Sequence, residues 1–161
     1  MTAASSAGAS VSSVDTHGWS DAPASARGKV VYSGGCHCGA VRFRVRAERN
    51  LVAWDCNCSI CAMKRNVHFI VPQEDFELAP EAEEHLREYR FGQQVARHRF
   101  CGRCGVQSFY HPRSNPDGIG VTVACLDDPP PEEYVEVRRF DGRNWDDTYQ
   151  TSNIAACSVA S

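Results

Sequence analysis

The chain has 161 residues, the usual size of one domain with its own hydrophobic core. Its formal net charge is −3, and its 17 basic residues are scattered along the chain, so no basic field indicates binding to nucleic acid or anionic lipid. No apolar run approaches the length of a membrane span. These properties argue against a polyanionic partner and give no direct nucleic-acid or membrane signal.

Residues 1–28 are rich in Ala, Ser and Gly and poor in large apolar side chains, so we expect a disordered tail there. This stretch lacks the basic and continuous apolar regions of a secretory signal, and its acidic residues are atypical of an organelle transit peptide. We therefore expect a reducing compartment, cytoplasmic or alternatively nuclear. In such a compartment, clustered cysteines are metal ligands or reactive thiols rather than disulfides.

Residues 29–150 are predicted to form a mainly β domain. Apolar and polar residues alternate in 40–46, "AVRFRVR", with Val41, Phe43 and Val45 on one face, as in a half-buried strand. In chain order, the strand-like segments are 29–34, 40–46, 51–55, 68–72, 88–92, 95–100, 108–111, 118–125 and 134–140. Short helical turns are expected after Cys58, around 80–86 and near 144–149. Residues 151–161 are predicted to be a flexible C-terminal tail.

The nine cysteines fall into three groups and two single residues. "CGRCG" has the form of a zinc knuckle, in which Gly105 permits a left-handed turn. The "GGCHCGA" pair can complete it, because one knuckle supplies two ligands and a tetrahedral zinc needs four. The spacing therefore predicts a closed structural zinc site formed by Cys36, Cys38, Cys101 and Cys104.

The stretch "DCNCSIC" contains a triplet of cysteines, Cys56, Cys58 and Cys61. Three thiolates leave one position of a tetrahedral zinc open, which is typical of a working site. Several alternatives remain for the cysteines. The clusters could be disulfides or reduced core cysteines, or the second zinc could be closed by a fourth side chain, for which the candidates are Cys125, His37, His68 and His98.

A zinc with three thiolates acidifies bound water weakly, since its ligands already overcompensate its charge. An incoming thiol would instead bind as its thiolate and become a nucleophile. A zinc deaminase would need a histidine followed two residues later by Glu, and this sequence has none. The triplet thus favours thiol chemistry.

The motifs "GGCHCGAVRF", "DCNCSIC", "FCGRCGVQSFYHPRSNP" and "CLD", in this order, resemble the glutathione-dependent formaldehyde-activating enzyme family. Among its members, the centromere protein V branch is the most similar. The resemblance extends over about residues 30–145. It implies an Mss4-like fold of packed antiparallel sheets, a structural zinc at the first four cysteines and a catalytic zinc at the triplet. The implied activity is a carbon–sulfur lyase reaction, the reversible addition of glutathione to formaldehyde giving S-hydroxymethylglutathione.

Two features depart from the family. Enzyme-like bacterial members commonly carry histidine in the middle of the triplet, where this chain has Asn57, as the centromere protein V branch does. That branch also has a long proline- and arginine-rich N-terminal extension associated with cytoskeletal and chromosomal roles, whereas residues 1–28 here are nearly uncharged, so they do not support microtubule or chromosome binding. Because Asn57 replaces the imidazole near the metal, the alternative function is a non-enzymatic, zinc-stabilised interaction domain, cytoskeletal or chromosomal as in the centromere protein V branch.

A glutathione pocket requires guanidinium and amide groups for the carboxylates of the substrate. The candidates by position are Arg65 and Asn66, just after the triplet, and Arg113 with Ser114 and Asn115. Cys125 is expected to pack near the triplet, while Cys157 is expected to be an exposed free thiol.

Overall fold

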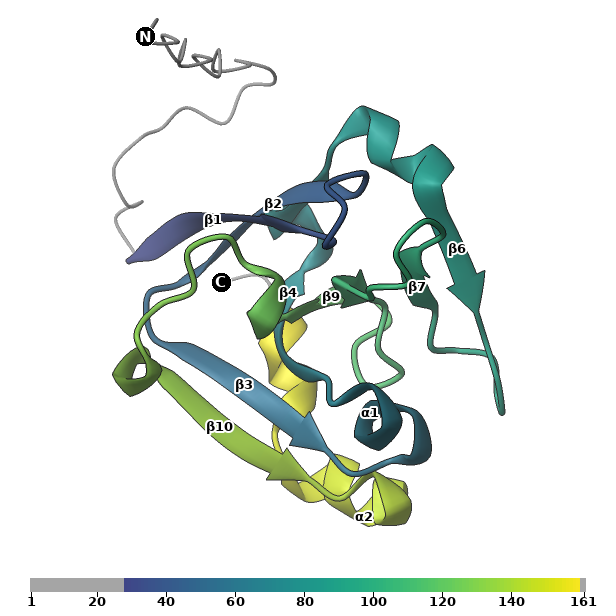
Figure 1. Cartoon of the computed structure of the whole chain (residues 1–161). Coiled ribbons are helices and arrows are strands. Elements are labelled where there is room, and N and C mark those ends of the chain that lie inside the picture. Colours follow the sequence, from purple (N-terminus) through teal and green to yellow (C-terminus); the bar gives the residue numbers. More distant parts are fainter. Residues whose placement is uncertain (1–27, 160–161) are drawn as a thin grey trace, which may run out of the picture.

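The computed structural model describes residues 28–159 (Figure 1). The tail predicted over residues 1–28 therefore lies, apart from Gly28, outside the described residues. Within the described part, no helix is long and apolar enough to cross a membrane.

The described strands form three sheets. The first has the order β1 (Lys29–Gly35), β2 (Arg42–Glu48), β5 (Phe76–Leu78). The second has the order β10 (Val135–Phe140), β3 (Leu51–Cys56), β4 (Val67–Pro72), β9 (Gly118–Thr122), β8 (Phe109–Tyr110). The third pairs β6 (Leu86–Tyr89) with β7 (His98–Cys101). Neighbouring strands are antiparallel except β3 and β10, which are parallel.

Helices are few and short. Over residues 28–159, the two α-helices are α1 (Ser59–Lys64) and α2 (Trp145–Thr151). The 3-10 turns are η1 (Gln73–Asp75), η2 (Pro80–His85), η3 (Val123–Cys125), η4 (Glu132–Tyr134), η5 (Gly142–Asn144) and η6 (Ile154–Ser158). The prediction of a mainly β protein with antiparallel sheets and few short helices is confirmed.

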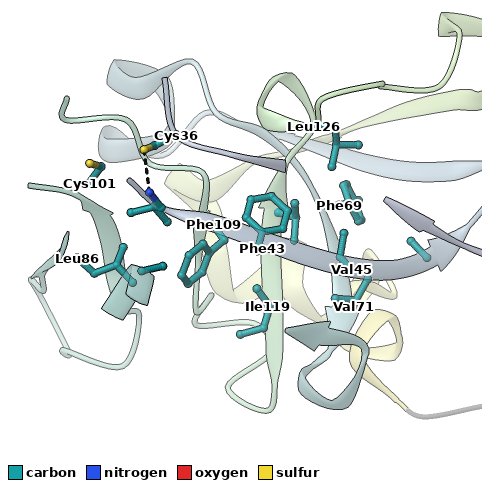
Figure 2. Close-up of a cluster of buried hydrophobic side chains, with 14 of the residues drawn as sticks. Cys36, Phe43, Val45, Phe69, Val71, Leu86, Cys101, Phe109, Ile119 and Leu126 are labelled. Carbon is teal, nitrogen blue, oxygen red and sulfur yellow. Dashed lines mark hydrogen bonds between the residues drawn. The ribbon is translucent and has the colours of Figure 1, made fainter. Parts of the chain in front are cut away.

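Every predicted strand segment overlaps an observed strand, and the predicted face of β2 is buried. Phe43 and Val45 lie at the centre of the main core, together with Phe109, Ile119 and Leu126 (Figure 2). Figure 2 also shows that Cys36 and Cys101 border this core. The core therefore extends up to the first cysteine group.

A second apolar cluster covers the opposite face of the five-stranded sheet. It consists of Trp54, Ile70, Phe140 and Ile154, with α2 residues packed against it. Successive side chains of a strand point to opposite faces, so on β4 Phe69 joins the main core while Ile70 joins the second cluster. Both faces of this sheet are thus covered, which explains why β4 is buried along most of its length.

Over the described residues 151–159, the structure does not match the flexible tail predicted for residues 151–161, because η6 packs against the second cluster. Ile154 is buried, and Asn115 Nδ2 donates to the carbonyl oxygens of Ile154 and Ala155 and to Ser158 Oγ. Cys157, predicted to be exposed, is half-buried against the same cluster. The prediction failed because the small residues of this segment gave no periodic signal, while their burial depends on a distant asparagine.

Parallel pairing of β3 and β10 determines where the cysteine triplet lies. Cys56 at the end of β3 is the register partner of Phe140 at the end of β10. The chain segments that follow these two strands therefore emerge at the same edge of the sheet, where Figure 1 shows α1 and α2. The triplet and the residues from Asp141 onward are brought together in this way.

Candidate functional site

The first cysteine group joins two turns that are distant in sequence. The sulfur atoms of Cys36, Cys38, Cys101 and Cys104 all lie within 4.8 Å of one another. The Val41 amide donates to Cys36 Sγ at 3.3 Å, and the Arg103 amide donates to Cys101 Sγ at 3.4 Å. Gly105 has a φ of 77°, the left-handed conformation expected for the knuckle. Four soft donors at these separations fit a tetrahedral zinc with no remaining position.

The triplet forms where β3 ends and α1 begins. Cys56 is the last residue of β3, Cys58 is the N-cap of α1, and Cys61 lies within the helix. Their sulfur atoms also lie within 4.8 Å of one another. The Cys58 amide donates to Cys56 Sγ at 3.4 Å. The strand-to-helix turn therefore gathers three donors that fit a zinc ion.

The three thiols share protons unequally. Hydrogen bonds from the Cys56 and Cys61 thiols lower the pKa of Cys58, and the backbone amides at the start of α1 act in the same direction. Hydrogen bonding to Cys56, and to a smaller extent to Cys58, raises the pKa of Cys61. A cluster that holds one thiolate so readily is suited to binding a cation in place of its remaining protons.

None of the four candidates for a fourth ligand joins the triplet among the residues described. Cys125 lies in η3 with its sulfur 4.0 Å from the carbonyl oxygen of Gln107, and it does not line the cavity beside the triplet. His37 is exposed between the two cysteines of the first group. His68 and His98 line the cavity, but their nitrogen atoms are not part of the cysteine cluster.

A cavity of about 480 Å³ adjoins the triplet. Its walls are largely apolar and aromatic, and Cys56, Cys58 and Cys61 form part of its lining. The cationic residues of the lining are Arg113 and Arg143, and the lining residues include no Asp or Glu. The cavity is therefore suited to an anionic ligand that carries a thiol to the cysteines.

The segment after β10 supplies one wall of this cavity through Gly142, Arg143 and Trp145. A Cβ atom at Gly142 would lie 2.6 Å from Cys56 Sγ and 2.7 Å from Cys58 Cβ, so only glycine fits against the triplet. These three residues are not among the site residues predicted from the sequence. An Asp-Gly pair after a strand is typical of a turn, but the approach of this turn to the cysteines follows from the parallel pairing of β3 and β10.

Asn57, in the middle of the triplet, is tied to the same segment. Its Nδ2 donates to Asp141 Oδ1 at 2.8 Å, and the Arg143 amide donates to its Oδ1 at 3.3 Å. The side-chain nitrogen and oxygen of Asn57 are both hydrogen-bonded, so Asn57 connects the cysteine turn to the turn that follows β10.

The predicted substrate residues separate into two groups. Arg113 and Ser114 line the cavity, and the Arg113 guanidinium lies 3.5 Å from the ring centroid of Trp145. Arg65 and Asn66 are not in the lining. Arg65 is the C-cap of α1 and is exposed. It is absent from the lining because it lies at the opposite end of the helix from Cys58, the N-cap.

Asn66 and Asn115 are buried structural residues in this fold. Asn66 Oδ1 accepts from Thr122 Oγ1 at 2.8 Å, and Asn115 holds the C-terminal turn described above. Asn66 and Asn115 are close in sequence to the cysteine triplet and to Arg113, respectively, but neither side chain lines the cavity.

Three buried rings form another part of the lining. Tyr110 Oη and His68 Nε2 are joined by a hydrogen bond of 2.8 Å. His98 stacks on Tyr110 with a centroid separation of 5.3 Å and an interplanar angle of 8°. Because all three residues also line the cavity, polar ring atoms are available close to the triplet.

The chain is similar to known proteins in both sequence and fold. The model of the glutathione-dependent formaldehyde-activating enzyme family matches residues 31–139. The chain belongs to this family. A crystal structure of a Rhodobacter sphaeroides protein is 34% identical to the chain, with a TM-score of 0.60, over 66% of this chain and 98% of that one. The family match ends before Gly142, Arg143 and Trp145, so this wall of the cavity lies beyond it.

Proposed function

We propose that the protein is a zinc-dependent carbon–sulfur lyase that interconverts glutathione plus formaldehyde and S-hydroxymethylglutathione. The observation that carries the proposal is the triplet of cysteines lining a cavity whose charged side chains are cationic. Family membership supports glutathione and formaldehyde as the substrates.

The two cysteine groups would hold two zinc ions with different roles. Cys36, Cys38, Cys101 and Cys104 would bind a structural ion, while Cys56, Cys58 and Cys61 would bind the second. When bound at the triplet, zinc lowers the pKa of an incoming thiol and stabilises the thiolate nucleophile.

The chain's own residues would bind and orient the tripeptide. Arg113 and Arg143 can form charge-assisted hydrogen bonds with the two carboxylates of glutathione. Stacking on Trp145 limits the orientations of the Arg113 guanidinium, which lowers the entropy lost on binding. The apolar walls would exclude water from the reacting carbon.

We further propose that the chain is closest to the centromere protein V branch of the family. Asn57 in the middle of the triplet supports this assignment. Its hydrogen bonds to Asp141 and from the Arg143 amide give the asparagine a role in holding the cavity wall.

The test combines binding with turnover. Cobalt in place of zinc should change its absorption when glutathione is added, because a thiol enters the coordination shell of the triplet. Exchange spectroscopy by NMR should show faster interconversion of formaldehyde and its glutathione adduct than in buffer alone. A spectrum unchanged by glutathione, with no acceleration of exchange, would favour the non-enzymatic interaction domain.

A further inference from the structure

We propose that Tyr110 and His68 form a proton relay for the reaction at the cysteine triplet, with Tyr110 touching the substrate oxygen and His68 acting through Tyr110. This inference rests on the proposed lyase function and extends it, because carbon–sulfur bond formation also requires proton transfer. The relay is carried by the hydrogen bond of 2.8 Å between Tyr110 Oη and His68 Nε2 in the lining of the cavity.

The strand arrangement places the two side chains together. Tyr110 on β8 and His68 on β4 lie on either side of β9, where Gly120 is the register partner of Tyr110. A Cβ atom at Gly120 would be 2.6 Å from Tyr110 Cε1 and 3.2 Å from His68 Cδ2. The absence of a side chain at Gly120 therefore provides the space in which the pair meets.

Neighbouring rings hold the pair in one orientation. The His68 and Tyr110 rings meet edge to face, with centroids 5.0 Å apart and an interplanar angle of 81°. On its other side, Tyr110 stacks on His98, which in turn stacks on Phe91 at 5.6 Å. These contacts restrict the rotation of both rings, so the hydrogen bond is already formed before the substrate binds and the two side chains need no further ordering.

The surroundings give each group the resting protonation state that a relay needs. Burial, followed by the negative charge of the three cysteines, raises the pKa of Tyr110, so the phenol remains protonated. Burial lowers the pKa of His68 to about 4, so the resting imidazole is neutral and would hold a proton from Tyr110 only transiently before returning it. The amide of Asn57 does not titrate and cannot serve this purpose.

The steps of the reaction balance as follows. Tyr110 takes the proton of the incoming thiol while its own phenolic proton passes to His68 Nε2. The thiolate sulfur then forms a bond with the formaldehyde carbon, and the carbonyl π pair moves to oxygen. Tyr110 gives a proton to that oxygen and recovers one from His68. The hydroxymethyl thioether is the only product, and its breakdown follows the same steps in reverse.

The experiment uses the full-length zinc protein with glutathione and formaldehyde. Tyr110→Phe retains the ring and its stacking but removes the hydroxyl, while His68→Gln retains a hydrogen-bonding group that cannot take up the proton. General acid–base catalysis typically contributes ~100-fold or more, so we expect both variants to reduce kcat by about that factor with little change in KM. Tyr32→Phe is the control, since Tyr32 is a hydrogen-bonded phenol outside the cavity.

A second readout does not depend on turnover. Long-range proton–nitrogen NMR should show His68 as a neutral imidazole with an unprotonated Nε2, whose signal shifts in Tyr110→Phe but not in Tyr32→Phe. Parent-like turnover in either variant, or a His68 signal unaffected by Tyr110→Phe, would refute the relay while leaving the lyase function intact. A parent protein that does not accelerate exchange would refute both.

Discussion

Gly142 lies directly against Cys56, so that a Cβ atom added to Gly142 would be 2.6 Å from the cysteine sulfur. The two residues are far apart in sequence and meet because β3 and β10 are parallel register partners at their ends. This contact connects the cysteine triplet to a segment beyond the family match, and it makes the geometry of the triplet dependent on the C-terminal part of the chain.

Gly142→Val should disrupt the second metal site without disrupting the first. The added side chain would overlap the Cys56 sulfur and Cys58 Cβ, and the turn would have to move away from the helix start. Elemental analysis should then show loss of the metal bound by the triplet and retention of the other. Gln150→Ala, at an exposed position on α2, is the control and should retain both metals. Full metal content in Gly142→Val would contradict the role given to this contact.

Cys101→Ser should unfold the domain, whereas Cys58→Ser should not. Cys101 lies among four donors that join β7 to the turn after β1, and structural zinc contributes on the order of 10 kcal/mol to folding. The triplet lies within one continuous strand-to-helix segment, so its metal constrains fewer distant parts of the chain. Thermal unfolding with parallel zinc analysis measures the difference, and similar melting temperatures for the two variants would rule out the assigned roles.

Arg113→Ala should weaken glutathione binding, while Arg65→Ala should have little effect. Arg113 lines the cavity, and loss of a charge-assisted hydrogen bond typically costs about 1.5–3 kcal/mol, or roughly 10-fold or more in Kd. Arg65 provides the matched control because it carries the same side chain outside the lining. Isothermal titration calorimetry with glutathione provides the measurement. Equal losses of affinity in the two variants would exclude the cavity as the glutathione site.

Ile154→Ala should destabilise the domain by about 2–5 kcal/mol, the usual cost of truncating a buried aliphatic side chain. Ile154 is 4% exposed and packs with Trp54 and Phe140, whereas the nearby Val159 is 67% exposed. Val159→Ala is therefore the control and should lie within about 0.5 kcal/mol of the parent. Urea unfolding curves of the two variants provide the comparison, and equal midpoints would show that η6 is dispensable for stability.

The stability of the parent should fall between pH 7 and pH 5 relative to His68→Gln. Burial lowers the pKa of His68 to about 4, below its value of 6.5 in the unfolded chain. As the pH falls below 6.5, the unfolded state binds a proton that the folded state does not, so folding becomes less favourable. The difference at pH 5 should be on the order of 2 kcal/mol. Urea unfolding at both pH values measures it, and parallel pH profiles would show that His68 titrates normally in the fold.

The strands and both cysteine groups could be predicted because their signals are local. The alternation of apolar and polar residues in 40–46 is a local pattern that predicts a half-buried strand. The C-x-x-C-G turn likewise depends only on its own glycine to bring its two sulfur atoms together. Pairing the two turns, each with two cysteines, required no more than the tetrahedral coordination of zinc. These inferences rely on residues that are close in sequence or on the number of ligands.

The cavity, in contrast, was decided by tertiary structure. Parallel pairing of β3 with β10 brings Gly142, Arg143 and Trp145 to the triplet, and β9 brings His68 and Tyr110 together through Gly120. Proximity in sequence instead favoured Arg65 and Asn66, which α1 and the sheet place elsewhere. The sequence by itself determined which residues can bind metal, since ligand chemistry belongs to the side chain. Only the pairing of distant strands determined what surrounds the metal, because long-range register depends on the packing of the whole core.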